Sequence, residues 1–283
     1  MARQQDLEYS GIFVELLRRI VAQPDDDNPR LEFAREWERR RVDGYDPDRA
    51  RFIRLQVHLA EIGDEHPEWF RLAAEADRLR VAKQPEWVPL WFVEADVRDP
   101  EFDRGFVESI TVNCSALRNP NFLGQLLSTA PIRHFNLVAA RDEDQVLDAI
   151  RTLVEFSGRE RILSLRIDGQ NLTDKTPQFL ADSRLINLQW LSLAYNEIGI
   201  EGTRALATGA RGGRLPSLFY VNLLGNPIDP TEQVLEDQGV VVSSFMPPFD
   251  IPDVPWLRKP VRFGRALQPN RFGARRQQFR GDQ

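Results

Sequence analysis

The residue types best suited to protein recognition lie in the second half of the chain. Arg166, Trp190 and Tyr220 belong to the types that dominate hot spots at protein interfaces. If the two aromatic residues occupy equivalent positions on neighbouring strands, about 4.8 Å apart, they form an exposed aromatic step. The pattern predicts a partner-binding surface, and four further polar residues lie at related positions: His134, Asn136, Asp168 and Asn222.

No residue pattern predicts catalysis, a cofactor or a metal. Asp25–Asp27 lack the spacing of a calcium loop, and carboxylates before a helix are favoured by its dipole. The three histidines fit no metal motif, and the single cysteine, Cys114, is expected to be a small buried side chain. We find no phosphate-binding glycine loop, nucleophile elbow or zinc-protease helix, so a non-enzymatic protein is expected.

The C-terminal segment is basic, whereas the rest of the chain is acidic. Residues 257–283 carry a net charge of +7 and the first 256 residues carry −13. Arginines interleaved with phenylalanines could follow a nucleic-acid backbone and stack on bases, or could dock on an acidic protein surface, including another copy of the chain. A solvated tail is the third reading. The candidate contacts are Arg262, Phe263, Arg265, Arg271, Phe272, Arg275 and Arg276.

An apolar motif recurs five times after residue 100. Apolar residues at i, i+3 and i+5 start 25, 30, 26 and 30 residues apart, the spacing of long leucine-rich repeats. The motifs begin at Val107, Ile132, Ile162, Leu188 and Leu218, and residues 240–242 would add a terminal strand.

Side chains alternate along a strand, so the residues between the apolar positions should form rows across one concave face. The first row is Ser109, His134, Ser164, Trp190 and Tyr220. The second row is Thr111, Asn136, Arg166, Ser192 and Asn222. The third row is Asn113, Val138, Asp168, Ala194 and Leu224.

Helical stripes separate the motifs, most clearly over residues 146–154. The run Leu188–Gly202, reading LQWLSLAYNEIGIEG, resembles the ribonuclease-inhibitor type of leucine-rich repeat, and residues 218–228 are similar to it. Asn196 and Asn226 occupy the place where such repeats use asparagine to bond turn backbone, so we expect both to be structural.

The first hundred residues read as helices. Apolar stripes predict helices over residues 12–21, 28–40, 48–62 and 67–81. Asn28 followed by Pro29 fits the start of the second helix. The sequence therefore predicts a small helical domain.

Part of that domain contains PDDD at 24–27, PRL at 29–31, Phe33-Ala34, Trp37 and RARFIRLQ at 49–56. With these motifs, about 45 residues resemble the bacterial repeat-companion domain. Arg35 and Arg51 stand where the family usually has Asp and Glu. The resemblance implies a helical domain that precedes leucine-rich repeats, and implies no activity.

The chain also lacks an eighteen-residue apolar run and a basic-then-apolar start. A cytoplasmic protein without membrane contact is therefore expected.

The sequence predicts an α/β protein with a helical repeat-companion domain at 1–100 that caps a leucine-rich-repeat solenoid at 101–242. The parallel strands lie on the concave side and the helices on the convex side, and a Pro-rich, basic tail follows at 243–283. We expect a scaffold or adaptor that binds a protein, as one subunit of a larger complex, through the concave face and the tail. A nucleic-acid-associated subunit that uses the tail is the alternative, and the oligomeric state stays open.

Overall fold

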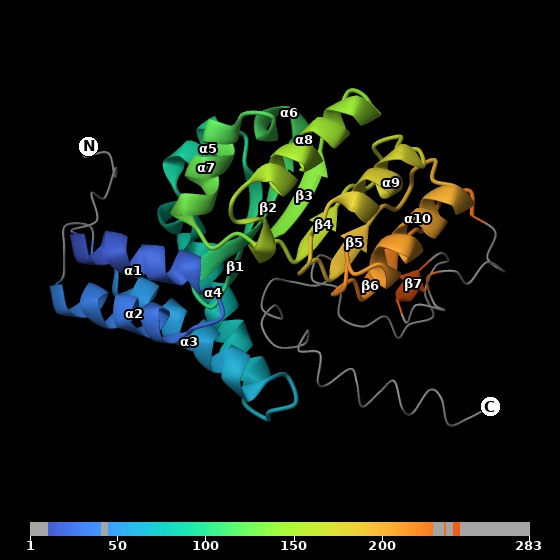
Figure 1. Cartoon of the computed structure of the whole chain (residues 1–283). Coiled ribbons are helices and arrows are strands. Elements are labelled where there is room, and N and C mark those ends of the chain that lie inside the picture. Colours follow the sequence, from blue (N-terminus) through green and yellow to red (C-terminus); the bar gives the residue numbers. More distant parts are fainter. Residues whose placement is uncertain (1–10, 41–44, 229–234, 236–239, 244–283) are drawn as a thin grey trace. The chain divides into compact units, whose positions relative to one another are not determined.

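The computed structural model describes residues 11–40, 45–228, 235 and 240–243. Its contacts divide the chain into two compact units (Figure 1). In the described residues, the helical unit comprises residues up to 89 together with 101–107, and the sheet unit comprises 90–100 together with residues from 108 onward.

Four helices build the helical unit, and each matches a helix predicted from the sequence. Asp46 begins the third, because its carboxylate accepts a hydrogen bond from the Asp48 amide. The fourth runs to Trp87, past the predicted end at residue 81. The bounds are α1 Gly11–Ala22, α2 Asn28–Arg40, α3 Pro47–Ile62 and α4 Trp69–Trp87.

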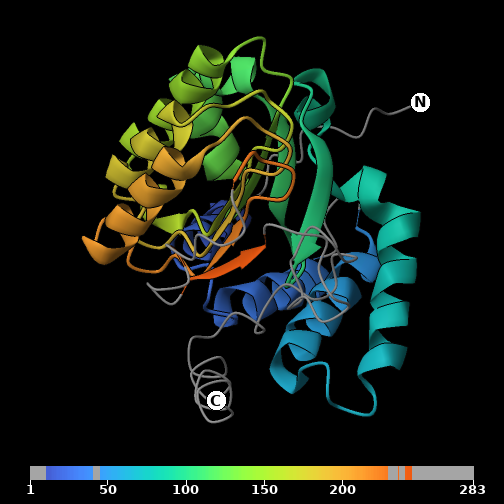
Figure 2. The same ribbon diagram turned by 90° about the vertical axis from the view of Figure 1, so that its right-hand side faces the viewer.

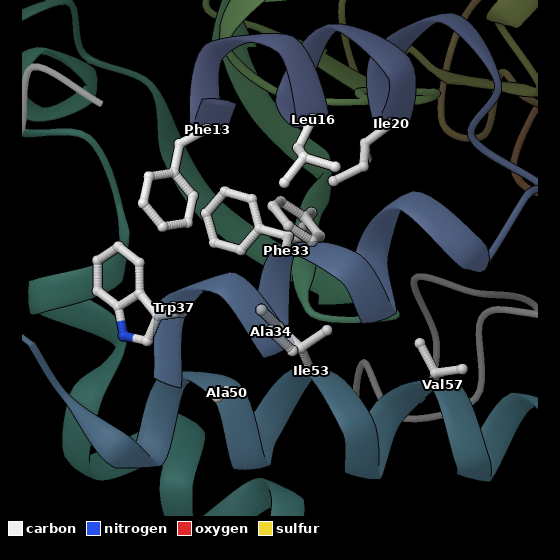
Figure 3. Packing of buried hydrophobic residues seen from close by; sticks show 10 residues of the cluster. Phe13, Leu16, Ile20, Phe33, Ala34, Trp37, Ala50, Ile53 and Val57 are labelled. Atoms are coloured by element: carbon white, nitrogen blue, oxygen red, sulfur yellow. The ribbon is translucent and has the colours of Figure 1, made fainter. Parts of the chain in front are cut away.

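Aromatic rings fill the core between the first three helices (Figure 3). Phe33 lies at its centre, with ring centroids 5.1 Å from Phe13 and 5.9 Å from Trp37. Phe106 meets Phe33 edge-on at 5.3 Å. Phe106 is remote in sequence from these helices, so a later segment completes the core.

That segment is a β-hairpin, which the sequence pattern did not predict. Strands β1 Arg98–Asp103 and β2 Phe106–Asn113 are neighbours in the sheet. Arg104 and Gly105 connect them with φ of +45° and +88°, as in the type I′ turns that suit two-residue hairpins. A connection this short makes the pair antiparallel.

Two buried side chains of the helical unit hold the hairpin turn. Arg30 is fully buried and donates hydrogen bonds to the carbonyl oxygens of Asp103 and Arg104, both at 3.2 Å. The Gln56 carboxamide accepts from the Gly105 amide at 2.7 Å and donates to the Phe102 carbonyl at 3.3 Å. The turn's polar backbone groups are thus bonded inside the core, where leaving them unbonded would cost about 1–3 kcal/mol each.

Arg49 stabilises the flanks of the turn through aromatic faces. Its guanidinium carbon lies 5.2 Å from the ring centroids of Trp87 and Phe106 and 5.6 Å from that of Phe102. Cation–π contacts of this kind are strongest when desolvated, and Arg49 is only 9% exposed. The hairpin is therefore part of the core of the helical unit.

The described strands form one mixed, mostly parallel sheet in the order β1 to β7. Pairs from β2 through β7 are parallel, and helices connect most of the successive strands. The remaining strands are β3 His134–Val138, β4 Ser164–Arg166, β5 Trp190–Ser192, β6 Tyr220–Asn222 and β7 Val241–Ser243. The predicted terminal strand is confirmed as β7.

Within the sheet unit, α8 packs on α9 and α9 on α10, and these helices lie on one face of the strands (Figure 2). On the other side of β3 to β6, Figure 2 shows no helix of this unit among the described residues. The helices are α5 Leu90–Glu94, α6 Cys114–Leu117, α7 Pro120–Thr129, α8 Glu143–Glu155, α9 Lys175–Asp182 and α10 Ile200–Arg211, with a 3₁₀ turn at Arg159–Arg161.

The apolar motifs supply the core between sheet and helices. Leu165, Leu191 and Val221, which occupy matching positions on three neighbouring strands, are each 0% exposed. Cys114 is also fully buried, as predicted, and burial raises its pKa to about 11. Its thiol is therefore protonated and unreactive at neutral pH.

The hairpin turn should be intolerant of any side chain at Gly105. A Cβ there would lie 2.5–2.9 Å from atoms of Ile53, at a φ of +88°. We expect Gly105→Ala to lower the free energy of unfolding by about 3–5 kcal/mol through backbone strain and overpacking, measured by chemical denaturation. Gly63→Ala is the control, because Gly63 also has positive φ but has nothing within 4 Å; its cost should be about 1–2 kcal/mol. Equal losses in the two variants would contradict the close packing of the hairpin turn against Ile53.

Candidate functional site

The first two predicted rows are aligned across the strands of the sheet unit. Strand register pairs Ser109 with His134, His134 with Ser164, Ser164 with Trp190, and Trp190 with Tyr220. The second row is aligned in the same way, from Thr111 to Asn222. The register predicted from the apolar motifs is therefore confirmed.

The expected exposure of the aromatic step is wrong. Trp190 is 0% exposed and Tyr220 is 2% exposed. Their rings are adjacent, with centroids 4.7 Å apart, and the indole also lies 6.0 Å from the ring of Phe219. Large rings on neighbouring strands pack on one another, so these two side chains present no surface to a partner in this conformation.

His134 also lies inward. Its Nδ1 and the Ser164 hydroxyl share a hydrogen bond of 2.7 Å, and the two side chains are 5% and 0% exposed. A nucleophilic serine requires access for its substrate, and this hydroxyl has none. The bond links β3 to β4 and makes the first row a buried row.

The second row is joined by hydrogen bonds that run across the strands. Asn222 donates to the Ser192 hydroxyl at 3.1 Å, and that hydroxyl donates to Asp168 Oδ1 at 2.6 Å. At the other end of the row, Asn136 donates to the Thr111 hydroxyl at 3.1 Å. These bonds hold the polar side chains in fixed positions.

Arg166 is the positively charged residue of the second row. Its Nε donates to Asp168 Oδ2 at 2.6 Å, and its side chain is 33% exposed. Its two terminal nitrogens make no hydrogen bond with the described residues. An arginine held at Nε presents its outer edge in a geometry that matches a carboxylate or a phosphate.

A fourth row borders the third and was missed at the sequence level. Ala139, Gly169, Tyr195 and Gly225 follow their strands at equivalent positions, and all four have φ between +54° and +76°. Glycine favours this conformation, but neither alanine nor tyrosine does, so no composition signal marks the row. Tyr195 is 61% exposed, which makes it the prominent aromatic residue of this edge.

Asn196 and Asn226 are structural, as predicted. The Asn196 carboxamide accepts from the amides of Gln170 and Leu172 and donates to the carbonyls of Ile167, Leu193 and Ala194. Asn226 accepts from the Ile198 amide and donates to the carbonyls of Leu193 and Leu223. Each amide therefore bonds the turn backbone of its own segment to that of the preceding one.

Other predicted contacts lie outside the described residues: Arg262, Phe263, Arg265, Arg271, Phe272, Arg275 and Arg276. Among the residues that the structure describes, no group of three or more His, Cys, Asp or Glu side chains could hold a metal ion. None of the described helices has the length and apolar character needed to cross a bilayer. The chain matches no protein-family model and no curated protein.

The second row should depend on the carboxylate of Asp168, a third-row residue that bonds Arg166 and Ser192. Asp168→Asn removes the charge that holds Arg166 and Ser192, and we expect the free energy of unfolding to fall by about 1.5–3 kcal/mol, measured by chemical denaturation. Asp182→Asn is the control, since Asp182 pairs with Arg214 at the surface and is 70% exposed. Its loss should stay below about 1 kcal/mol. An Asp168 loss as small as the Asp182 loss would show that the row adds no rigidity.

Proposed function

We propose that the sheet unit is a short leucine-rich-repeat array and that the chain is a non-enzymatic scaffold that binds a protein through the second row. The observation that carries this proposal is the set of fixed polar side chains around Arg166, on a sheet face free of helices in the described part of the unit. The partner contacts are Arg166, Asn136 and Asn222 of the second row and Asp168 of the third row.

The repeat assignment is supported by the recurrence of turn geometry as well as sequence. The left-handed residue appears at the same place after β3, β4, β5 and β6. Asn196 and Asn226 occupy the next position in two of these turns. A chain that repeats strand, turn and helix in this way builds a surface of aligned side chains.

The repeat-companion assignment of the helical unit is supported by what its motif residues do. Arg30 and Gln56 hold the hairpin turn by hydrogen bonds, and Arg49 packs on its flanking rings. All three belong to the segments on which the resemblance rests. Arg51, which stands where the family usually has glutamate, pairs with Glu75. This difference from the family therefore leaves the contacts of Arg30, Arg49 and Gln56 with the hairpin unchanged.

A protein partner fits the second row better than a reacting substrate does. Asp168 uses both oxygens within the protein, because Oδ1 also accepts from the Ala194 amide at 3.0 Å. The hydrogen bonds to both oxygens direct this carboxylate toward groups of the protein itself. Preorganised amides, hydroxyls and one arginine are suited to recognition, since little side-chain entropy is lost on binding.

Arg166→Ala should weaken partner capture about tenfold or more, the loss expected for an interface hot spot. Recovery of partners by the full-length chain from native lysate is compared by quantitative mass spectrometry after nuclease treatment. Arg151→Ala is the matched control, because Arg151 lies on α8 among the helices, pairs with Asp148 at 2.7 Å and is 49% exposed. Its variant should recover partners as the unaltered chain does.

Salt concentration and nuclease treatment distinguish the scaffold from the alternative, a nucleic-acid-associated subunit. If recovery requires nucleic acid, falls steeply with salt and depends on the arginines of residues 257–283, the scaffold proposal fails. The nucleic-acid-associated reading then takes its place. Trp190 and Tyr220 are unsuitable for this test because both are buried.

A further inference from the structure

Helix α4 carries exposed apolar side chains along one line of its surface. Phe70 and Val81 are each 66% exposed, and Ala74 is exposed between them. At about 100° per residue, these three side chains fall within about 40° of one another around the helix and extend over about 16 Å of its length. We call Phe70, Ala74 and Val81 the α4 stripe.

The stripe is separate from the face that α4 buries. The helix packs on α3, and its buried residues are Trp69, Leu72, Ala73 and Ala76. Phe70 meets the buried Trp69 ring edge-on, with centroids 5.4 Å apart, which supports the exposed ring from one side. A single exposed apolar residue is ordinary, whereas apolar side chains aligned on one helix face form the pattern that partner helices bind.

Basic side chains border the stripe on one side. Arg71 and Arg78 lie about 70° around the helix from it. Arg51 of α3 reaches the same side, where its Nε donates to Glu75 at 2.9 Å. Glu75 also pairs with Arg71, and Arg71 pairs with Glu68. Three arginines thus share two carboxylates, so this side of the stripe carries a net positive charge.

Arg78 has no carboxylate partner among the described residues, and its Nε donates to the Ala74 carbonyl of its own helix at 3.3 Å. A pocket of about 300 Å³ lies beside it, lined by Arg51, Glu75, Arg78 and Leu79. Leu79 gives this pocket an apolar wall, and the two arginines give it a positively charged one. A glutamate side chain matches both, because its methylenes can lie on Leu79 while its carboxylate meets the guanidinium of Arg78.

The charges favour an acidic partner over other occupants of the stripe. A second copy that packed its own α4 antiparallel on the stripe would set Arg71 and Arg78 against the same arginines, and like charges across an interface are costly. An anionic lipid surface would meet Glu68 and Glu75 among the arginines, whereas helices that bind membranes present a cationic polar face.

We propose that the α4 stripe and its arginines bind an amphipathic helix of an acidic partner protein, with apolar anchors on Phe70 and Val81 and a carboxylate at Arg78. Amphipathic helices are commonly bound through apolar anchors at i, i+4 and i+7. The site lies within the helical unit, so it holds whether or not the second row binds a partner.

The test presents the full-length chain with a displayed library of helical peptides. Each peptide is long enough to span the stripe, with apolar residues at i, i+4 and i+7 and random residues elsewhere. Peptides that also bind Phe70→Ser with Val81→Ser are discarded. We expect the remaining peptides to carry more Asp and Glu than Lys and Arg beside the apolar positions.

Fluorescence anisotropy then measures the affinity of the most enriched peptide. Arg71→Glu with Arg78→Glu should lower this affinity about tenfold or more, because carboxylates would oppose carboxylates. A version of the peptide with lysine in place of its acidic residues should bind this variant and should not bind the unaltered chain.

The matched control is Val14→Ser with Arg18→Glu, which changes an exposed valine and an exposed arginine on α1. Its affinity for the peptide should equal that of the unaltered chain. Arg166→Ala should also leave the affinity unchanged, which separates this site from the second row. If Phe70→Ser with Val81→Ser fails to fold by circular dichroism, Ala74→Lys places a long charged side chain in the middle of the stripe and should abolish binding in its place.

Several results would overturn the proposal. The library could yield no peptide that distinguishes the stripe variant, the recovered peptides could lack the acidic excess, or the α1 control could lose as much affinity as the α4 variant. Binding to phosphatidylglycerol vesicles that is lost in the stripe variant would assign the stripe to a lipid surface. A concentration-dependent dimer in sedimentation that is lost in the same variant would assign it to a second copy.

Discussion

The fold of the helical unit depends on a hairpin turn held by side chains that are far away in sequence. Arg30 bonds backbone 73 residues later, and Gln56 bonds backbone 49 residues later. Without these bonds the turn would leave buried carbonyl and amide groups unbonded, at a cost comparable to a large share of a domain's stability. Phe106, which follows the turn directly, packs in the aromatic core. The aromatic core and the hydrogen bonds of Arg30 and Gln56 to the turn therefore form together.

The sheet unit is stabilised by links between consecutive segments. Glu143, at the start of α8, accepts hydrogen bonds from the amides and hydroxyls of Thr173 and Thr176. Asp174, at the start of α9, accepts from the amides of Gly199 and Gly202 at the start of α10. Each carboxylate thus bonds amides that a helix start leaves free. With the Asn196 and Asn226 bonds, these links fix the register that aligns the rows.

The aligned strands place two adjacent rows of side chains in different environments. In the first row, the aromatic and hydroxyl side chains are buried and contact one another. In the second row, Arg166 donates from Nε to Asp168, and its side chain is part-exposed. Tyr195 adds an exposed ring at the border. One row is therefore a buried aromatic row, and the other is a row of polar side chains held in place by hydrogen bonds.

The sequence by itself determined the elements and their register. The apolar spacing predicts β2 to β6, and the apolar stripes predict α1 to α4 and α7 to α10, whereas α5 and α6 have no such signal. The structural role of Asn196 and Asn226 also follows from their place in the repeat pattern. These are local properties, because the period of an apolar pattern reflects the geometry of its own segment.

Only the tertiary structure decided which surfaces are open. The β1–β2 hairpin, the clamp by Arg30, Arg49 and Gln56, the burial of Trp190 and Tyr220, and the left-handed Tyr195 have no signature in local periodicity. Exposure depends on what remote chain packs against a side chain, and a two-residue turn is stable in a core only if distant groups bond its backbone. Such information lies in the assembled molecule, because the pattern of a single segment carries no record of its neighbours.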